Sequence, residues 1–121
     1  MNVLRLTRHD ASEKQISELN RISKKFGLHG ADVENVSETL PPQPREAVQR
    51  FDGIVGDVPI VEAVLPINLM QAVLEHSEFS KRGGILLRAI TERTLHDNEE
   101  VTFTFSHYEH IKAVKIESER V

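Results

Sequence analysis

Apolar residues near the N-terminus change from a short continuous run to a helical stripe. Residues Asn2–Thr7 are typical of a strand. Apolar residues then recur at steps of three and four, the spacing of one helix face: Ile16, Leu19, Ile22 and Phe26. Asp10 precedes Glu13 by three positions, which predicts a capping box at the start of this helix, and Gly27 is expected to end it.

The following segments repeat the succession of strand and helix. Further strands are predicted at Asp32–Val36, Ile60–Leu65 and Ile85–Ile90. Between them, one helix is expected to start at Pro44 and close at Asp52-Gly53. A third helix is expected to start at Pro66 and to end at the Lys-Arg-Gly-Gly segment 81–84.

Beyond residue 90 the pattern becomes an alternation with period two. Val101–Phe105 and Ile111–Ile116 alternate, with the polar segment Ser106–His110 between them, which predicts an antiparallel hairpin at a sheet edge. A turn at Asp97-Asn98 is expected to join it to an extended fourth strand. The whole pattern predicts a single α/β domain over residues 1–121, with three layers and a mostly parallel sheet that carries a C-terminal antiparallel hairpin.

Composition restricts the class of protein. Hydrophobic residues make up 39% and charged residues 28% of the 121 residues, which is typical of a globular domain. Stretches long enough for a membrane span and the apolar core of a signal peptide are both lacking, so we expect a cytoplasmic protein that does not bind membranes. Cysteine is absent, which excludes thiol nucleophiles and thiolate zinc sites.

Charge and histidine spacing restrict the partners. A net charge of −4 argues against a protein that coats duplex DNA. His107 and His110 lie three positions apart in a predicted hairpin rather than on a helix, so they form no metal motif. We therefore expect neither a metal ion nor a cofactor, and no DNA duplex as a partner.

Candidate binding residues follow from a positional rule. Parallel sheets bind ligands outside the carboxyl ends of their strands. The residues that follow the first three predicted strands are Thr7, Arg8, His9 and Asp10, then Ser37, Glu38 and Thr39, then Asn68; Arg88, Thr91, Glu92 and Arg93 lie near the end of the fourth. Arg88 and Arg93 differ by an odd number of positions, so on one regular strand they face opposite sides.

The loop Thr7–Asp10 carries a guanidinium and an imidazole next to each other, the most reactive combination among these candidates. A guanidinium binds a phosphate with two donors, and an imidazole transfers protons near neutral pH. The loop also precedes a helix N-terminus, which attracts anions. In the alternative interpretation, Asp10 only caps the helix while Arg8 and His9 point into water.

Two further candidates also have structural alternatives. Asn68 would bind a ribose or a base edge, or else cap the third helix. Arg88 interrupts an apolar strand, so it would bind a ligand or pair with Glu62 in the neighbouring strand.

The segment 4–19 resembles the N-terminal unit of several small CRISPR-accessory families with Rossmann-like folds. In those families a short strand ends in a polar loop with His, and the next helix carries Thr or Ser, an acidic residue and Gln. The matching positions are Leu4, Leu6, Thr7, His9, Ser12, Glu13, Gln15 and Leu19. Beyond residue 19 the resemblance consists only of chain size and the order of strands and helices.

The resemblance implies a compact protein, often a homodimer, that binds or cleaves cyclic oligoadenylate second messengers of antiviral defence. A metal-independent ring nuclease of this type directs a ribose 2′-hydroxyl at the adjacent phosphate. In this chain Arg8 would bind the phosphate and His9 would transfer a proton or stabilise the leaving group. Thr7 and Asn68 would orient the substrate, and Asp10 and Arg88 would contribute to ligand binding.

Two other functions fit the same residues. The protein would bind a cyclic or other anionic nucleotide without cleaving it, or it would act as a protein–protein adaptor whose edge hairpin, Val101–Ile116, pairs with another chain.

Overall fold

A mixed sheet of five strands runs through the centre of the protein. The computed structural model describes residues 1–112. Its strands have the order β2-β1-β3-β4-β5, in which the first four are parallel and β5 is antiparallel to β4. The strands are β1 (Val3–Arg5), β2 (Val33–Asn35), β3 (Ile60–Glu62), β4 (Ile85–Leu95) and β5 (Val101–His110). The predicted fold class is confirmed.

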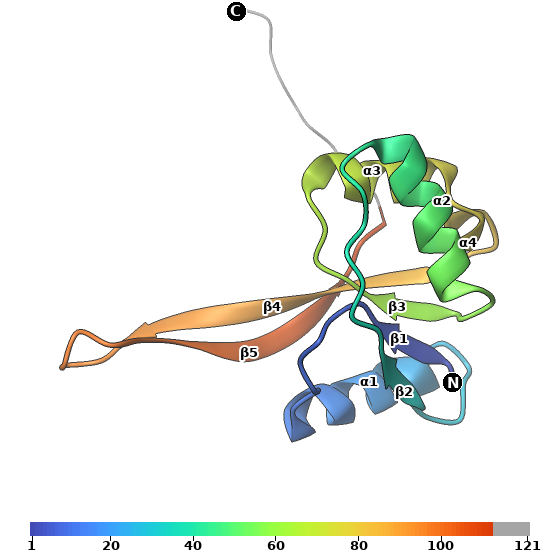
Figure 1. Cartoon of the computed structure of the whole chain (residues 1–121). Coiled ribbons are helices and arrows are strands. Elements are labelled where there is room, and N and C mark those ends of the chain that lie inside the picture. The colour runs from blue at the N-terminus through green and yellow to red at the C-terminus, as the bar shows by residue number, and fades with distance from the viewer. Residues whose placement is uncertain (113–121) are drawn as a thin grey trace, which may run out of the picture.

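Helices cover the two faces of the sheet, as Figure 1 shows. One face is covered by α1 (Glu13–Lys25), and the other by α2 (Pro44–Val55), α3 (Ile67–His76) and the short α4 (Glu78–Lys81). This segregation follows from right-handed crossovers on either side of β1, because the chain proceeds to β2 on one side and to β3 on the other.

Two apolar cores result from the period of the strands. Because successive side chains point to opposite faces, Val3 packs on the α1 side with Leu19 and Ile22, whereas Leu4 packs on the other side with Phe51. The rings of Phe51 and Phe79 meet edge to face in this second core, with centroids 5.4 Å apart.

The start of α1 corrects the predicted capping box. Ser12 is the N-cap: its side chain accepts a hydrogen bond from the backbone of Gln15, whose side chain bonds back to the backbone of Ser12. Asp10 and Glu13 therefore do not form the predicted box. The cap lies two residues later, which releases Asp10 for another contact.

Two other helix boundaries also differ from the prediction. The helix α2 starts with Pro44 as expected but continues through Gly53 to Val55, where Gly56 with positive φ ends it. The third predicted helix is broken at Ser77, whose hydroxyl donates to the carbonyl of Val73 and accepts from the backbone of Ser80. This serine ends α3 and caps α4.

The C-terminal hairpin lies at the predicted edge, but it turns elsewhere. The strand β4 continues to Leu95, and the turn near Asp97-Asn98 joins it to β5, as expected. The polar segment Ser106–His110, predicted as a turn, is instead the second half of β5. Its polarity reflects exposure at an edge strand. Most of the predicted strand Ile111–Ile116 lies outside the described residues.

The tight packing of Gly84 against Phe79 generates a stability prediction. A Cβ atom at Gly84 would lie 2.4 Å from the ring of Phe79 and 2.6 Å from its carbonyl oxygen, whereas a Cβ atom at Gly53 meets open space. We expect Gly84→Ala to lower the free energy of unfolding by about 1–3 kcal/mol, because the core cannot absorb the methyl group. The matched Gly53→Ala should raise it by about 0.5–1 kcal/mol, because helices favour alanine. Urea denaturation of both variants checks this, and equal effects would contradict it.

Candidate functional site

A buried ion pair joins the adjacent inner strands β1 and β3. Arg5 at the end of β1 and Glu62 at the end of β3 are register partners, and they are only 3% and 6% exposed. The Nε atom of Arg5 donates to Oε1 of Glu62 at 2.8 Å. Charges of this kind are buried only when they are paired, so each residue fixes the other.

Tyr108 of β5 completes the pair from the α1 side. Its hydroxyl donates a hydrogen bond to Oε1 of Glu62. Burial and this bond to a carboxylate raise the pKa of Tyr108 well above its ordinary value. Burial lowers the pKa of Arg5, but the hydrogen bond and charge of Glu62 outweigh it, so the net pKa lies above the ordinary value. The tyrosine therefore stays neutral and the arginine charged.

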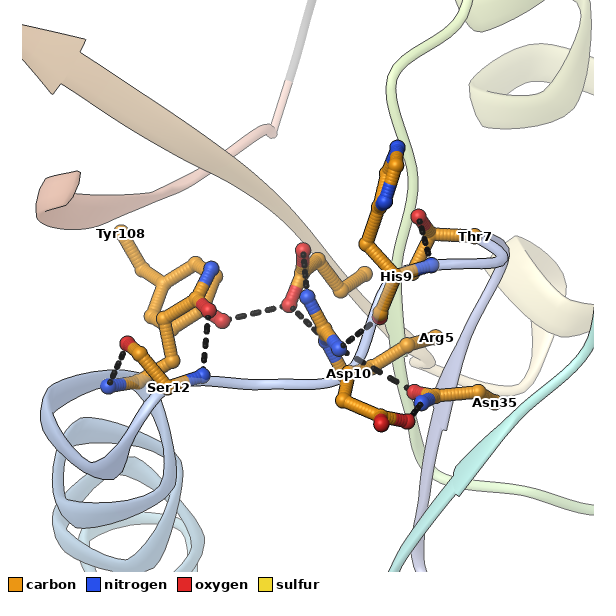
Figure 2. A network of polar contacts seen from close by, with 9 residues as sticks. Arg5, Thr7, His9, Asp10, Ser12, Asn35 and Tyr108 are labelled. Carbon is orange, nitrogen blue, oxygen red and sulfur yellow. Dashed lines mark hydrogen bonds and ion pairs between the residues drawn. The ribbon is translucent and has the colours of Figure 1, made fainter. Parts of the chain in front are cut away.

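The same arginine also anchors the loop that follows β1. Its Nη1 atom donates to the backbone carbonyl of His9 at 2.8 Å and to Oδ1 of Asn35 at 3.1 Å. The amide of Asn35 in turn donates to the carboxylate of Asp10 at 3.2 Å. Figure 2 shows this network, in which Arg5 and Asn35 hold the loop at His9 and Asp10.

The anchored loop leaves its functional side chains exposed. Arg8 and His9 are both exposed, and the imidazole of His9 points away from the network in Figure 2. Within the loop, the backbone N–H of His9 donates to the hydroxyl of Thr7 at 3.2 Å. A fixed backbone with an exposed guanidinium and an exposed imidazole suits the capture of an anion.

A depression of about 370 Å³ lies at the carboxyl edge beside this loop. It is lined by Leu6, Glu38, Thr39, Leu40, Pro42, Val64, Leu65, Pro66 and Leu69. Val64 is 75% exposed. The predicted loops after β1, β2 and β3 thus meet at one edge of the sheet, as the positional rule requires.

Asn68 and Arg88 lie at the same edge. Neither has the structural role that was the alternative to ligand binding: a helix cap for Asn68 and a pair with Glu62 for Arg88. Asn68 is exposed in the first turn of α3, whose N-cap is Pro66, so it does not cap the helix. Arg88 does not pair with Glu62, which binds Arg5 instead. Arg88 is exposed one residue beyond the end of the β3–β4 pairing, so it needs no partner.

The sequence did not reveal that Arg5, Glu62 and Tyr108 form one group that organises the site. Arg5 and Glu62 were visible as charges inside apolar strands, and such charges require partners. Their pairing depends on β1 lying beside β3, which chain order does not specify. The contribution of Tyr108 depends in addition on the position of the hairpin.

The described residues include neither a metal-binding cluster nor a membrane-spanning helix. Among residues 1–112, three or more His, Asp or Glu side chains nowhere gather in a group that could hold a metal ion. The helices of this part of the chain are too short or too polar to cross a membrane.

The ion pair generates a second stability prediction. Arg5→Met leaves the carboxylate of Glu62 buried without its cation, so we expect a loss of about 3–5 kcal/mol of unfolding free energy. The double variant Arg5→Met/Glu62→Met should recover much of this loss. As a control, Arg21→Met, which removes the exposed bond to Glu18, should change stability little. Chemical denaturation measures the stability of all three variants. An equal loss for Arg5→Met and Arg21→Met would refute the buried role of Arg5.

Tyr108 generates a pH prediction with a direct optical readout. The chain has 1 tyrosine and 0 tryptophans, so ultraviolet absorbance reports this phenol alone. We expect little tyrosinate in the folded protein at about pH 10, where an unperturbed tyrosine is half-ionised, and normal ionisation in denaturant. The raised pKa stabilises the fold fully below about pH 10, and this contribution declines as the pH rises further. Tyr108→Phe should remove that decline, whereas ionisation of the folded protein near pH 10 would disprove the buried bond.

Comparison with protein-family models, with curated protein sequences and with solved structures yields no match. The side chains of the carboxyl edge are therefore the basis for assigning a function. They offer an exposed cation and an exposed imidazole on one anchored loop, beside a depression with an apolar lining.

Proposed function

We propose that this protein cleaves cyclic oligoadenylates without a metal ion, at the loop Thr7–Asp10. One observation carries the proposal: Arg8 and His9 are exposed on a loop whose backbone is held by the buried Arg5. The resemblance of segment 4–19 to ring nucleases supplies the class of substrate. Positioning and fixed donors are the main sources of rate in such a reaction.

The chemistry needs few groups. The 2′-hydroxyl of one adenosine attacks the adjacent phosphorus, the bond from phosphorus to the 5′-oxygen breaks, and a 2′,3′-cyclic phosphate forms. Arg8 binds the non-bridging oxygens of the phosphate, where negative charge increases. His9 donates a proton to the departing 5′-oxygen, while water takes up the proton of the 2′-hydroxyl.

The surroundings of the loop suit a nucleotide. The apolar lining at Val64, Leu65 and Pro66 offers a surface for an adenine ring. Thr7 and Asn68 provide polar groups for the ribose, and Arg88 is an additional exposed cation at this edge. Asp10 is engaged by Asn35, so its contribution is to hold the loop while it faces the ligand.

The test is incubation of the purified protein with cyclic tri-, tetra- and hexa-adenylate in EDTA, followed by chromatography of the products. We expect linear products that end in a cyclic phosphate. His9→Ala should lower the cleavage rate by about 10²–10⁴-fold, because the proton donor is lost. Arg8→Ala should lower it by about 10²–10³-fold, because charge on the phosphate is no longer stabilised.

Matched controls keep the test specific. His29→Ala and Lys24→Ala alter exposed residues that precede the amino end of β2, opposite the candidate edge, so both should retain the full rate. If the ligand stays intact and co-elutes with the protein, the function is nucleotide binding rather than cleavage. Cleavage that persists in both His9→Ala and Arg8→Ala would refute the assignment of the loop.

A further inference from the structure

The end of the hairpin forms an arm that leaves the body of the protein. The arm consists of 91–95 of β4 and 101–105 of β5, beyond the point where β4 pairs with β3. Figure 1 shows it projecting away from the helices and from the other strands. Within residues 1–112, little of the chain therefore covers the side chains of the arm.

The two faces of the arm differ in polarity. Cross-strand register partners point to the same face. One face carries the pairs Leu95 with Val101, Arg93 with Phe103, and Thr91 with Phe105; the other carries Glu92 with Thr104 and Thr94 with Thr102. Leu95 and Phe103 are each 68% exposed. An exposed aromatic face on a projecting arm is typical of an interaction surface.

A bulge makes this apolar face continuous with the body. The register of β5 shifts between its pairings with Ile90 and Thr91, so Phe105 and Tyr108 share a face although their numbers differ by three. Their ring centroids lie 4.9 Å apart. The strip of aromatic side chains thus runs from Phe103 at the arm to Tyr108 beside α1.

No strand covers the outer edge of β5 within the described residues, and the carbonyl of Phe105 accepts a hydrogen bond from Nζ of the exposed Lys14 at 3.2 Å. This strand is last in the sheet order, so within the described residues its outer backbone groups pair with no strand. Such an edge is a template for strand addition. Two copies of one edge satisfy each other when they run antiparallel about a two-fold axis.

The charges at the two ends of β5 are opposite. The tip of the hairpin exposes the carboxylates Asp97, Glu99 and Glu100. The other end of β5 borders a groove of about 320 Å³ between α1 and the strand, lined by Arg21, Ile22, Lys25, Phe26, Leu87, Tyr108, His110 and Lys112. Arg21, Lys25 and Lys112 bring three cationic groups to this groove. Burial, and secondarily the charges of Lys112 and Lys25, lowers the pKa of His110.

We propose that β5 pairs edge to edge with β5 of a second copy of this chain, antiparallel, about a two-fold axis between Phe105 and Ser106. In this register Val101 faces His110 of the second copy, and Phe103 faces Tyr108. The faces agree, because the bulge places Phe103 and Tyr108 on the same side of the sheet. The occupant of the open edge is therefore the same strand.

This register also brings the opposite charges together. Glu99 and Glu100 of each tip reach Ile111 and Lys112 of the other copy, beside its basic groove. Each acidic tip then neutralises the cations of that groove, twice per dimer because of the two-fold symmetry. The inference does not depend on the proposed function, because it uses none of the residues of the Thr7–Asp10 loop.

Sedimentation analysis of the full chain tests the association. We expect a dimer, and Phe103→Glu should raise its dissociation constant about ten-fold or more, because a central aromatic contact is lost and a charge is introduced. Thr94→Glu is the matched control: it adds the same charge on the polar face of the arm, away from the edge of β5, and should leave the dimer intact. A monomer at every concentration, or equal weakening by both variants, would overturn the proposal.

Cysteine cross-linking tests the register without disturbing the core. The natural chain has 0 cysteines, so an introduced thiol has no competitor. When Val101→Cys and His110→Cys proteins are mixed and oxidised, we expect a disulfide between the two. Neither protein alone should cross-link, because the two copies of position 101 lie about 30 Å apart along the paired strands. Cross-linking of Val101→Cys with itself, or a dimer in which the mixture does not cross-link, would overturn the register.

Discussion

The buried pair of Arg5 and Glu62 links the fold to the candidate site. A charge enclosed between two strands is tolerated only with its partner in place, so the pair fixes β1 against β3 in one register. The donors of Arg5 that do not bind Glu62 extend outward, to the carbonyl of His9 and to the side chain of Asn35. The same guanidinium therefore specifies strand pairing and the shape of the exposed loop.

Tyr108 connects this network to the hairpin. Its hydroxyl reaches Glu62, while its ring contacts Phe105 and thereby the apolar face of the arm. In the proposed dimer, Phe103 of the second copy lies against this tyrosine. The interface and the Thr7–Asp10 loop are thus separated by a short chain of contacts: Tyr108, Glu62, Arg5 and His9. A phosphate bound at the loop and a second copy bound at the arm would stabilise the same buried charges.

Local chemistry made much of the fold predictable. The stripe from Ile16 to Phe26 specified α1, and Pro44 specified the start of α2, because helix periodicity and the fixed φ of proline act within a few residues. The exposed Arg8 and His9 could be located because the carboxyl ends of parallel strands share one edge. The missed boundaries have local competitors. Ser12 forms a capping box with Gln15 in place of the one expected between Asp10 and Glu13, and the Ser77 hydroxyl ends one helix while starting the next.

The sequence by itself determined the alternation of strands and helices up to β4, the mostly parallel class of the sheet and the loop that carries Arg8 and His9, because each depends on neighbours along the chain. Only the tertiary structure decided that Glu62 pairs with Arg5 rather than with Arg88. Both β1 and β4 lie beside β3, but the strand register places Arg5 and Leu87, not Arg88, opposite Glu62. It also decided that Ser106–His110 is a strand, because polar residues at an exposed sheet edge have the composition of a turn. Interactions distant in sequence depend on which surfaces meet, and an alternation of polar and apolar residues does not encode that choice.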